Sequence, residues 1–192
     1  MIIQTSILAS CQGAIDKKDI RQHLRAICFD FDESTNKLSI VGTNAQIMIV
    51  NTIKVKDEND IAFCKKHFTD NTAYFWDRDL NKKNLYSDFT EIDGQVVLNG
   101  TILTKLDTQY PNWKCVIPQK DLAPATKYCG FNCDLIKQID KAMGWKHETI
   151  ITKIPRVNSK DENEYLCPHR WDLNYFDDCD TIVLCMPMRL EH

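Results

Sequence analysis

The apolar positions at the start of the chain follow a helical period. From Arg25 onward the period becomes two, with a polar turn over Asp32–Asn36, which predicts strands over 26–31, 37–41 and 46–55. The side of the helix expected to be buried holds Ile3, Ile7, Leu8, Cys11, Ala14 and Ile15. We therefore predict a helix over Ile3–Ile15 followed by three strands.

The middle of the chain is less regular. Lys56–Trp76 has apolar residues without a sustained period, so it predicts no element. Beyond it, Phe89–Ile92 and Gln95–Leu106 alternate on either side of the turn pair Asp93-Gly94, which predicts a hairpin. Tyr110–Pro118 contains two prolines and is typical of a linker.

A second helix is predicted after the linker. Its start can be capped by Asn132 or Asp134, and Gly144 is placed to end it. Its apolar side would hold Leu135, Ile136, Ile139 and Met143. Three strands follow, predicted at His147–Ile154, Trp171–Phe176 and Asp180–Met186. Two helix-plus-strands units therefore recur around a strand-rich middle.

Composition narrows the class of protein. Hydrophobic residues make up 43% and charged residues 27% of the 192, as in globular proteins. The net charge of −3 argues against a basic surface over the whole molecule, so any DNA contact must be local. No apolar run reaches the roughly 18 residues of a membrane span, and the first ten residues lack a signal-peptide pattern. We expect a cytoplasmic protein without a membrane partner.

Metal and catalytic sites have little support in the sequence. The nine cysteines are scattered and odd in number, so most are expected to be reduced and buried. The spacings Cys129-x3-Cys133 and Cys167-Pro-His169 do not supply a tetrahedral zinc site. Phosphate loops, nucleophile elbows and His-Glu-x-x-His helices are missing, so no catalytic residue, metal or cofactor is expected.

An acidic group near the C-terminus leaves one enzymatic alternative open. It consists of Asp172, Asp177, Asp178 and Asp180. Such carboxylates can hold the divalent ion of a nuclease, although a solvated loop explains them better because their spacing matches no calcium loop. The nuclease alternative therefore ranks last.

Four stretches resemble one family in the family's order. The most specific is the tail Met186-Pro-Met-Arg-Leu190, preceded by the strand pattern from Thr181. The others are Lys18–Asp32, Asp107–Pro118 and Gly130–Lys141. Together they resemble the bacterial DNA polymerase III beta subunit, the replicative sliding clamp. This resemblance implies an α+β DNA clamp fold, with antiparallel sheets and helices packed on one face.

The departures from the family pattern are equally specific. A family subunit has three domains of two helix-plus-strands halves each, whereas this chain is roughly half as long and one half-domain is missing after Pro118. The family signature Thr-Asp-Gly-His-Arg-Leu is altered to Thr43-Asn-Ala-Gln-Ile-Met48. We expect a clamp-like domain over 1–119 and a C-terminal half-domain over 120–190. Glu191 and His192 extend past the family's end and resemble an expression tag.

The resemblance implies two binding sites. Basic residues are expected to face DNA phosphates, through a strip formed by the loop after the first helix and by the second helix. This strip comprises Lys17, Lys18, Arg21, Gln22, His23, Lys137 and Lys141. Solvated surface charge is an equally good interpretation, because runs of charged residues usually lie on a solvated surface. The first helix has no lysine or arginine, which weakens the DNA interpretation.

The second implied site is a cleft for short linear motifs of polymerase and repair proteins. Flexible, polarizable methionines suit such a cleft. Its residues by resemblance are Leu24, Thr43, Met48, Pro118, Leu184, Met186, Pro187, Met188, Arg189 and Leu190. Without the resemblance, the last methionines would be ordinary ends of a core strand.

The resemblance thus implies a non-catalytic processivity factor that binds duplex DNA and clamp-binding peptides. A chain of this length would need to form a homo-oligomer to encircle DNA. The alternative is a clamp relative that keeps the cleft without forming a ring and acts as an adaptor or decoy. The missing half-domain and the lost Gly, His and Arg of the signature favour this alternative.

Overall fold

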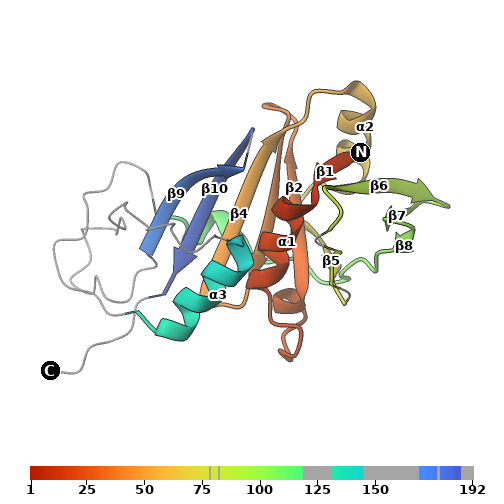
Figure 1. The fold of residues 1–192 in the computed structure, drawn as a ribbon. Coiled ribbons are helices and arrows are strands. Elements are labelled where there is room, and N and C mark those ends of the chain that lie inside the picture. The colour runs from red at the N-terminus through yellow and green to blue at the C-terminus, as the bar shows by residue number, and fades with distance from the viewer. Residues whose placement is uncertain (78, 82, 119–130, 145–168, 177, 187–192) are drawn as a thin grey trace, which may run out of the picture.

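The structure is a computed structural model that describes residues 1–77, 79–81, 83–118, 131–144, 169–176 and 178–186. In this part of the chain every paired strand is antiparallel, and the strands form one sheet of six and one of four. Helices α1 and α3 lie next to each other on one face of the larger sheet (Figure 1). The expected combination of antiparallel sheets with helices on one face is confirmed.

The six-stranded sheet joins segments from both ends of the chain. In spatial order it contains β5 (Thr72–Phe75), β2 (Ala26–Asp32), β3 (Lys37–Thr43), β4 (Ile47–Lys54), β10 (Cys179–Cys185) and β9 (His169–Phe176). The four-stranded sheet contains β1 (Ile2–Gln4), β6 (Tyr86–Ile92), β7 (Gln95–Leu98) and β8 (Thr101–Ile102). The helices are α1 (Thr5–Ala14), α2 (Glu58–His67) and α3 (Cys133–Met143), with 3-10 turns η1 (Gln22–Arg25) and η2 (Trp113–Val116).

The first predicted helix is shorter than expected. Ile2–Gln4 forms strand β1, which pairs with β6 so that Ile2 lies opposite Asp88, and α1 begins only at Thr5. The helical spacing of Ile3 and Ile7 is real, because both are buried in the same core. The assignment of Ile3 to the helix was wrong. Its partner in β6 is more than 80 residues away in the sequence, and a local period of apolar residues says nothing about pairing over that separation.

Helix α2 lies in the segment for which no element was predicted. The Asp57 side chain caps its start by accepting hydrogen bonds from the backbone N–H groups of Asn59 and Asp60. Acidic residues occupy its first turn, and Lys65, Lys66 and His67 occupy its last turn, as the helix dipole favours. Only Cys64 and His67 of this helix are buried, so its apolar pattern is too sparse to reveal it.

The predicted hairpin is confirmed at its turn. Asp93 and Gly94 have φ of 51° and 78°, as the favoured two-residue turn requires. The predicted strand Gln95–Leu106 is wrong beyond Leu98, because a second turn of the same kind follows at Asn99 and Gly100, with φ of 49° and 77°. The Asn-Gly pair was a readable signal for this second turn.

Helix α3 and the last two strands agree with the predictions. The Asn132 side chain accepts from Asp134 N–H, and Gly144 ends the helix with φ of 66°. The predicted strands Trp171–Phe176 and Asp180–Met186 correspond to β9 and β10. The third predicted strand, His147–Ile154, lies outside the described residues.

Strand β10 pairs with β4 over its whole length, from Cys179 opposite Ile53 to Cys185 opposite Ile47. The C-terminal strands therefore complete the sheet begun by the N-terminal ones. The division into residues 1–119 and 120–190 stays a prediction, but the described residues on either side of it share a sheet and a core. None of the helices in the described ranges is long and apolar enough to span a membrane.

The two faces of the six-stranded sheet are covered by different parts of the chain. On the helix face, α1 and α3 pack against residues such as Ile40, Ile49 and Val183. On the opposite face, here called the outer face, Leu106 and the predicted linker residues Tyr110 and Trp113 belong to a second core. Their partners in this core are Ala26, Cys28, Val41, Val50 and Ala73. Alternation along each strand therefore separates two sets of side chains.

Candidate functional site

Three predicted cleft residues lie next to one another across the outer face. Thr43 of β3 is opposite Met48 of β4, and Met48 is opposite Leu184 of β10. Directly opposite residues of antiparallel strands have Cβ atoms about 5 Å apart, so these side chains form a continuous row. The sheet thus brings together residues separated by more than 130 positions in the sequence.

The turn between β3 and β4 fixes one end of this row. The Thr43 hydroxyl donates to Ile47 O over 2.7 Å, and the Asn44 side chain accepts from Gln46 N and Ile47 N over 2.9 Å each. Ala45 has a φ of 72°, a conformation that glycine adopts with less strain. The turn therefore forms without the glycine of the family signature.

Two other predicted cleft residues are tied to the same edge of the molecule. Met186 N–H donates to Gln46 O over 2.8 Å, so the end of β10 lies against the β3–β4 turn. Arg170 of β9 lies opposite Leu184 and donates to Pro118 O over 2.5 Å. Thr43, Met48, Pro118, Leu184 and Met186 are therefore linked by the sheet and its hydrogen bonds.

Arg170 is a site residue that the sequence analysis missed. Its guanidinium is buried and donates to Asp172 through Nε and Nη2, at 3.1 and 2.6 Å. Arg170 and Asp172 alternate with Trp171 and Leu173, whose side chains belong to the helix-face core. This polar and apolar alternation was the signal that placed Arg170 on the outer face.

Most of the described cleft residues are covered. Leu24, Thr43 and Leu184 are 2%, 8% and 3% exposed, whereas Met48, Met186 and Pro118 are half-buried. Met48 packs against the outer core that contains Tyr110 and Trp113. Leu24 lies in η1, where the neighbouring His23 ring meets the Tyr110 ring edge-on at 6.4 Å. The linker segment therefore occupies the face on which the cleft was predicted.

The remaining cleft residues, Pro187, Met188, Arg189 and Leu190, lie outside the described residues. The sequence metal candidates Cys129 and Cys167 also lie outside them. Five of the seven cysteines that the structure describes are buried, and burial raises the pKa of the Cys11 and Cys64 thiols to about 12. Such thiols stay protonated near neutral pH.

Two cations of the predicted DNA strip, Lys17 and Arg21, are paired with acidic residues. Lys17 Nζ donates to Asp79 over 2.8 Å. Arg21 makes two hydrogen bonds to Asp19, and this pairing lowers the pKa of the Asp19 carboxyl to about 2. Lys18 and Gln22 are exposed, and His23 is partly covered beside Tyr110.

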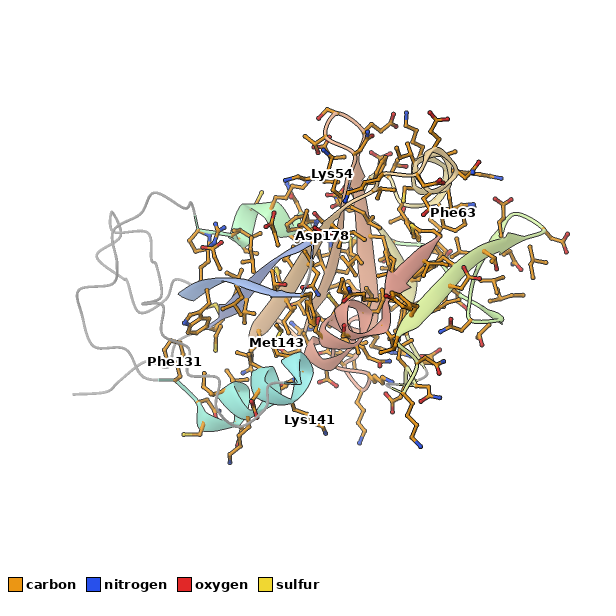
Figure 2. All side chains as sticks on the ribbon, turned by 45° about the horizontal axis from the view of Figure 1, so that its top comes forward. Lys54, Phe63, Phe131, Lys141, Met143 and Asp178 are labelled. Carbon is orange, nitrogen blue, oxygen red and sulfur yellow. The ribbon has the colours of Figure 1, made fainter. Side chains whose placement is uncertain are left out.

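The exposed side of α3 carries no net charge. It presents Lys137 and Lys141 together with Asp134 and Asp140, and Lys137 lies 3.4 Å from Asp134. Figure 2 shows Lys141 directed away from the body of the protein, whereas Met143 is on the side of α3 near α1. Helix α1 is mostly buried and has no basic residue. The described helices therefore lack the excess of positive charge that duplex DNA attracts.

The acidic group near the C-terminus is partly paired with cations. Besides the pair between Asp172 and Arg170, Asp178 lies 3.9 Å from Lys56 and Asp180 lies 4.0 Å from Lys37. In the described part of the chain, no three metal-ligating side chains come together. Asp177 is outside it. The observed pairs favour the solvated-loop interpretation over the nuclease alternative.

A cavity of about 240 Å³ is lined by residues that belong to neither predicted site. Its lining includes Ala9 of α1, Met143 at the end of α3 and Phe176 at the end of β9. None of the predicted DNA or peptide residues lines it.

Comparisons with known proteins agree with this architecture. No family model matches the sequence, and no curated protein matches it. Solved structures do match. The DNA polymerase III beta subunit of Thermotoga maritima is 13% identical with a TM-score of 0.57, and the match covers 100% of this chain and 65% of that one. The beta sliding clamp of C. crescentus is 11% identical with a TM-score of 0.58, covering 99% and 65%.

A third structure contains a bound peptide. The Helicobacter pylori beta clamp bound to a DNA ligase peptide is 12% identical with a TM-score of 0.54, covering 98% of this chain and 66% of that one. This chain therefore spans slightly less than two thirds of the length of these clamps. The likeness shows that the chain has the DNA clamp fold, so the resemblance is confirmed at the level of fold.

Proposed function

We propose that the protein is a non-catalytic, sliding-clamp-like protein of DNA replication that binds short peptides of polymerase or repair proteins. The row of Thr43, Met48 and Leu184 on the outer face carries this proposal, because residues chosen from two distant segments, the β3–β4 hairpin and β10, meet there. A protein of the same fold has been solved with a DNA ligase peptide. Pro187, Met188, Arg189 and Leu190 follow Met186 in the sequence and are proposed to complete the site.

Met48 provides the most direct test of the peptide site. We expect Met48→Ala to weaken binding of the DNA ligase peptide about tenfold, because burying a methionine side chain against a ligand contributes about 1.5 kcal/mol. The measurement is fluorescence anisotropy with the labelled peptide.

The matched control for this test is Ile53→Ala. Ile53 is on the same strand and is also half-buried, but it packs against the core of the helix face. Both variants lose apolar contacts, so a general loss of stability would affect them alike. Equal affinity of the wild type and Met48→Ala, or an equal loss in both variants, contradicts the proposed site.

A second candidate function differs only in the role of DNA. The neutral surface of α3 and the paired cations of the loop favour an adaptor or decoy that binds peptides without encircling duplex DNA. A processivity factor would instead have to assemble several copies into a ring, with 17–23 and α3 facing the phosphates.

Solution mass distinguishes these two functions. For the adaptor, we expect light scattering to give the same monomer mass with and without circular duplex DNA. Lys137→Ala with Lys141→Ala should then change DNA retention less than twofold. An oligomer retained on circles and released when they are linearised would establish a working clamp and reject the adaptor.

A further inference from the structure

One continuous segment crosses the outer face from edge to edge. At the β5 edge, Phe75 N–H donates to Thr104 O over 2.9 Å and Leu106 N–H donates to Ala73 O over 2.8 Å. At the β9 edge, Pro118 O accepts from Arg170. Residues 103–118, here called the strap, therefore span the sheet between its two outermost strands.

The middle of the strap covers the outer face. Tyr110 and Trp113 are buried in the same cluster as Cys28, Val41 and Val50, and Met48 packs against this cluster. Cys28 is fully buried on this face. A peptide that packs on Met48 needs part of the surface that the strap occupies, because Met48 packs against the cluster that contains Tyr110 and Trp113.

The strap is held by polar contacts at a few points. Lys114 Nζ lies 2.6 Å from a carboxylate oxygen of Asp30, which is buried, and 5.3 Å from the centre of the Trp113 ring. The Asn112 side chain accepts from Lys114 N–H and so caps η2, the short 3-10 turn of the strap. These contacts fix Lys114 above Asp30.

Two buried polar atoms of the strap lack hydrogen-bond partners within the described part of the chain when the strap is closed. Tyr110 Oη and Trp113 Nε1 have no hydrogen-bond partner in the described residues. Water can bond to both atoms when the strap lifts, so closure desolvates them without replacing their bonds. Removing the Tyr110 hydroxyl should therefore stabilise the closed position, whereas removing the Lys114 cation should destabilise it.

We propose that the middle of the strap, residues 110–114, is an autoinhibitory cover of the peptide site, closed in this structure and displaced when a peptide binds, while Pro118 stays bonded to Arg170 as part of the site. This inference rests on the proposed function of the outer face. The covered state reduces the apparent peptide affinity by the fraction of molecules that are open. The Lys114–Asp30 pair favours the closed state, and the unpartnered Tyr110 hydroxyl favours the open state.

Peptide affinity tests the proposed cover through two opposite variants. Lys114→Ala leaves Asp30 without its cation only while the strap is closed, so we expect about tenfold tighter binding of the DNA ligase peptide. Tyr110→Phe removes the unpartnered hydroxyl, so we expect about fivefold weaker binding together with a more stable protein. Lys65→Ala breaks an exposed ion pair with Glu33, outside both predicted sites, and should change affinity less than twofold.

Thiol labelling tests opening of the strap without any ligand. Cys28 lies in the cluster beneath the strap, whereas Cys11 lies in the core of the helix face, and both are fully buried. We expect iodoacetamide to label Cys28 at least about fivefold faster than Cys11 in the wild type, because local opening exposes Cys28 before global unfolding. Lys114→Ala should increase the Cys28 rate alone, as measured by mass spectrometry of peptides.

The two experiments separate the possible failures. Equal labelling rates at Cys28 and Cys11, rising together in Lys114→Ala, would show that the strap opens only on unfolding and would overturn the cover. Peptide binding by the wild type with no change in Lys114→Ala or Tyr110→Phe would also overturn it, while leaving the proposed function intact. If the wild type and every variant fail to bind the peptide, the proposed function is wrong. The strap then has no regulatory role, even if Cys28 is labelled faster than Cys11.

Discussion

Replacing Gly42 with alanine is expected to cost about 3 kcal/mol or more of folding free energy, a large part of a typical domain's stability. Gly42 lies on β3 under α1, and a Cβ atom added there would overlap the carbonyl oxygen of Cys11. Cys11 cannot move aside easily, since its thiol donates to Ile40 O over 3.2 Å and its neighbours are buried. Helix α1 must therefore shift off the sheet.

The control for this substitution is Gly94→Ala in the β6–β7 turn. Gly94 has open space around the added atom but a φ of 78°, so alanine there is strained without a clash. Strain of this kind costs about 1 kcal/mol. Urea unfolding followed by circular dichroism gives both free energies, and equal losses would show that the close approach of α1 to β3 is not a constraint.

Local chemistry explains the parts of the fold that were predicted correctly. Asn132 and Gly144 delimit α3, and Asp93-Gly94 fixes a turn, because each of these signals acts within a few residues. Helix α2 was missed although Asp57 capped it, because most of its surface is exposed and gives no apolar stripe. A search that weighed caps and end charges alone would have found it.

Partners far apart in sequence explain the errors and the gaps. Nothing near Ile2 in the sequence indicates that it pairs with β6, and nothing near Thr181 indicates that β10 pairs with β4. Both pairings depend on how the whole core closes. Strand existence was therefore predictable at several positions, whereas strand order was not.

The candidate site shows the same division. Thr43, Met48 and Leu184 were named from a resemblance, and the sheet register alone places them in one row. The packing of Met48 could not be anticipated, because it involves Tyr110 and Trp113 of a segment predicted only as a linker. The charge pattern of 17–23 predicted a basic strip, but Asp19 and Asp79 pair with its cations in the folded chain.

Replacing Asn51 with leucine is expected to cost about 3 kcal/mol and to weaken the attachment of β10. Asn51 is fully buried on β4. Its amide nitrogen donates to Ile7 O over 2.9 Å and to the Ser10 hydroxyl over 2.7 Å, while its oxygen accepts from the Thr181 hydroxyl over 2.8 Å. One side chain thus joins α1, β4 and β10, and hydrogen exchange of β10 amides should rise with the loss of stability.

A double-mutant cycle with Thr181→Val separates this network from simple loss of packing. Thr181→Val alone removes the donor to the buried Asn51 oxygen, whereas the double variant places two apolar side chains opposite each other on β4 and β10. We expect the double variant to lose about 1 kcal/mol less than the sum of the two single losses. Additive losses would mean that the hydrogen bond contributes nothing to holding β10, and therefore Leu184, beside Met48.

Thr52→Ala is the control, because it breaks the half-buried hydroxyl pair with Ser39 on the neighbouring strand. It should cost only about 0.5 kcal/mol and leave the β10 amides protected from hydrogen exchange.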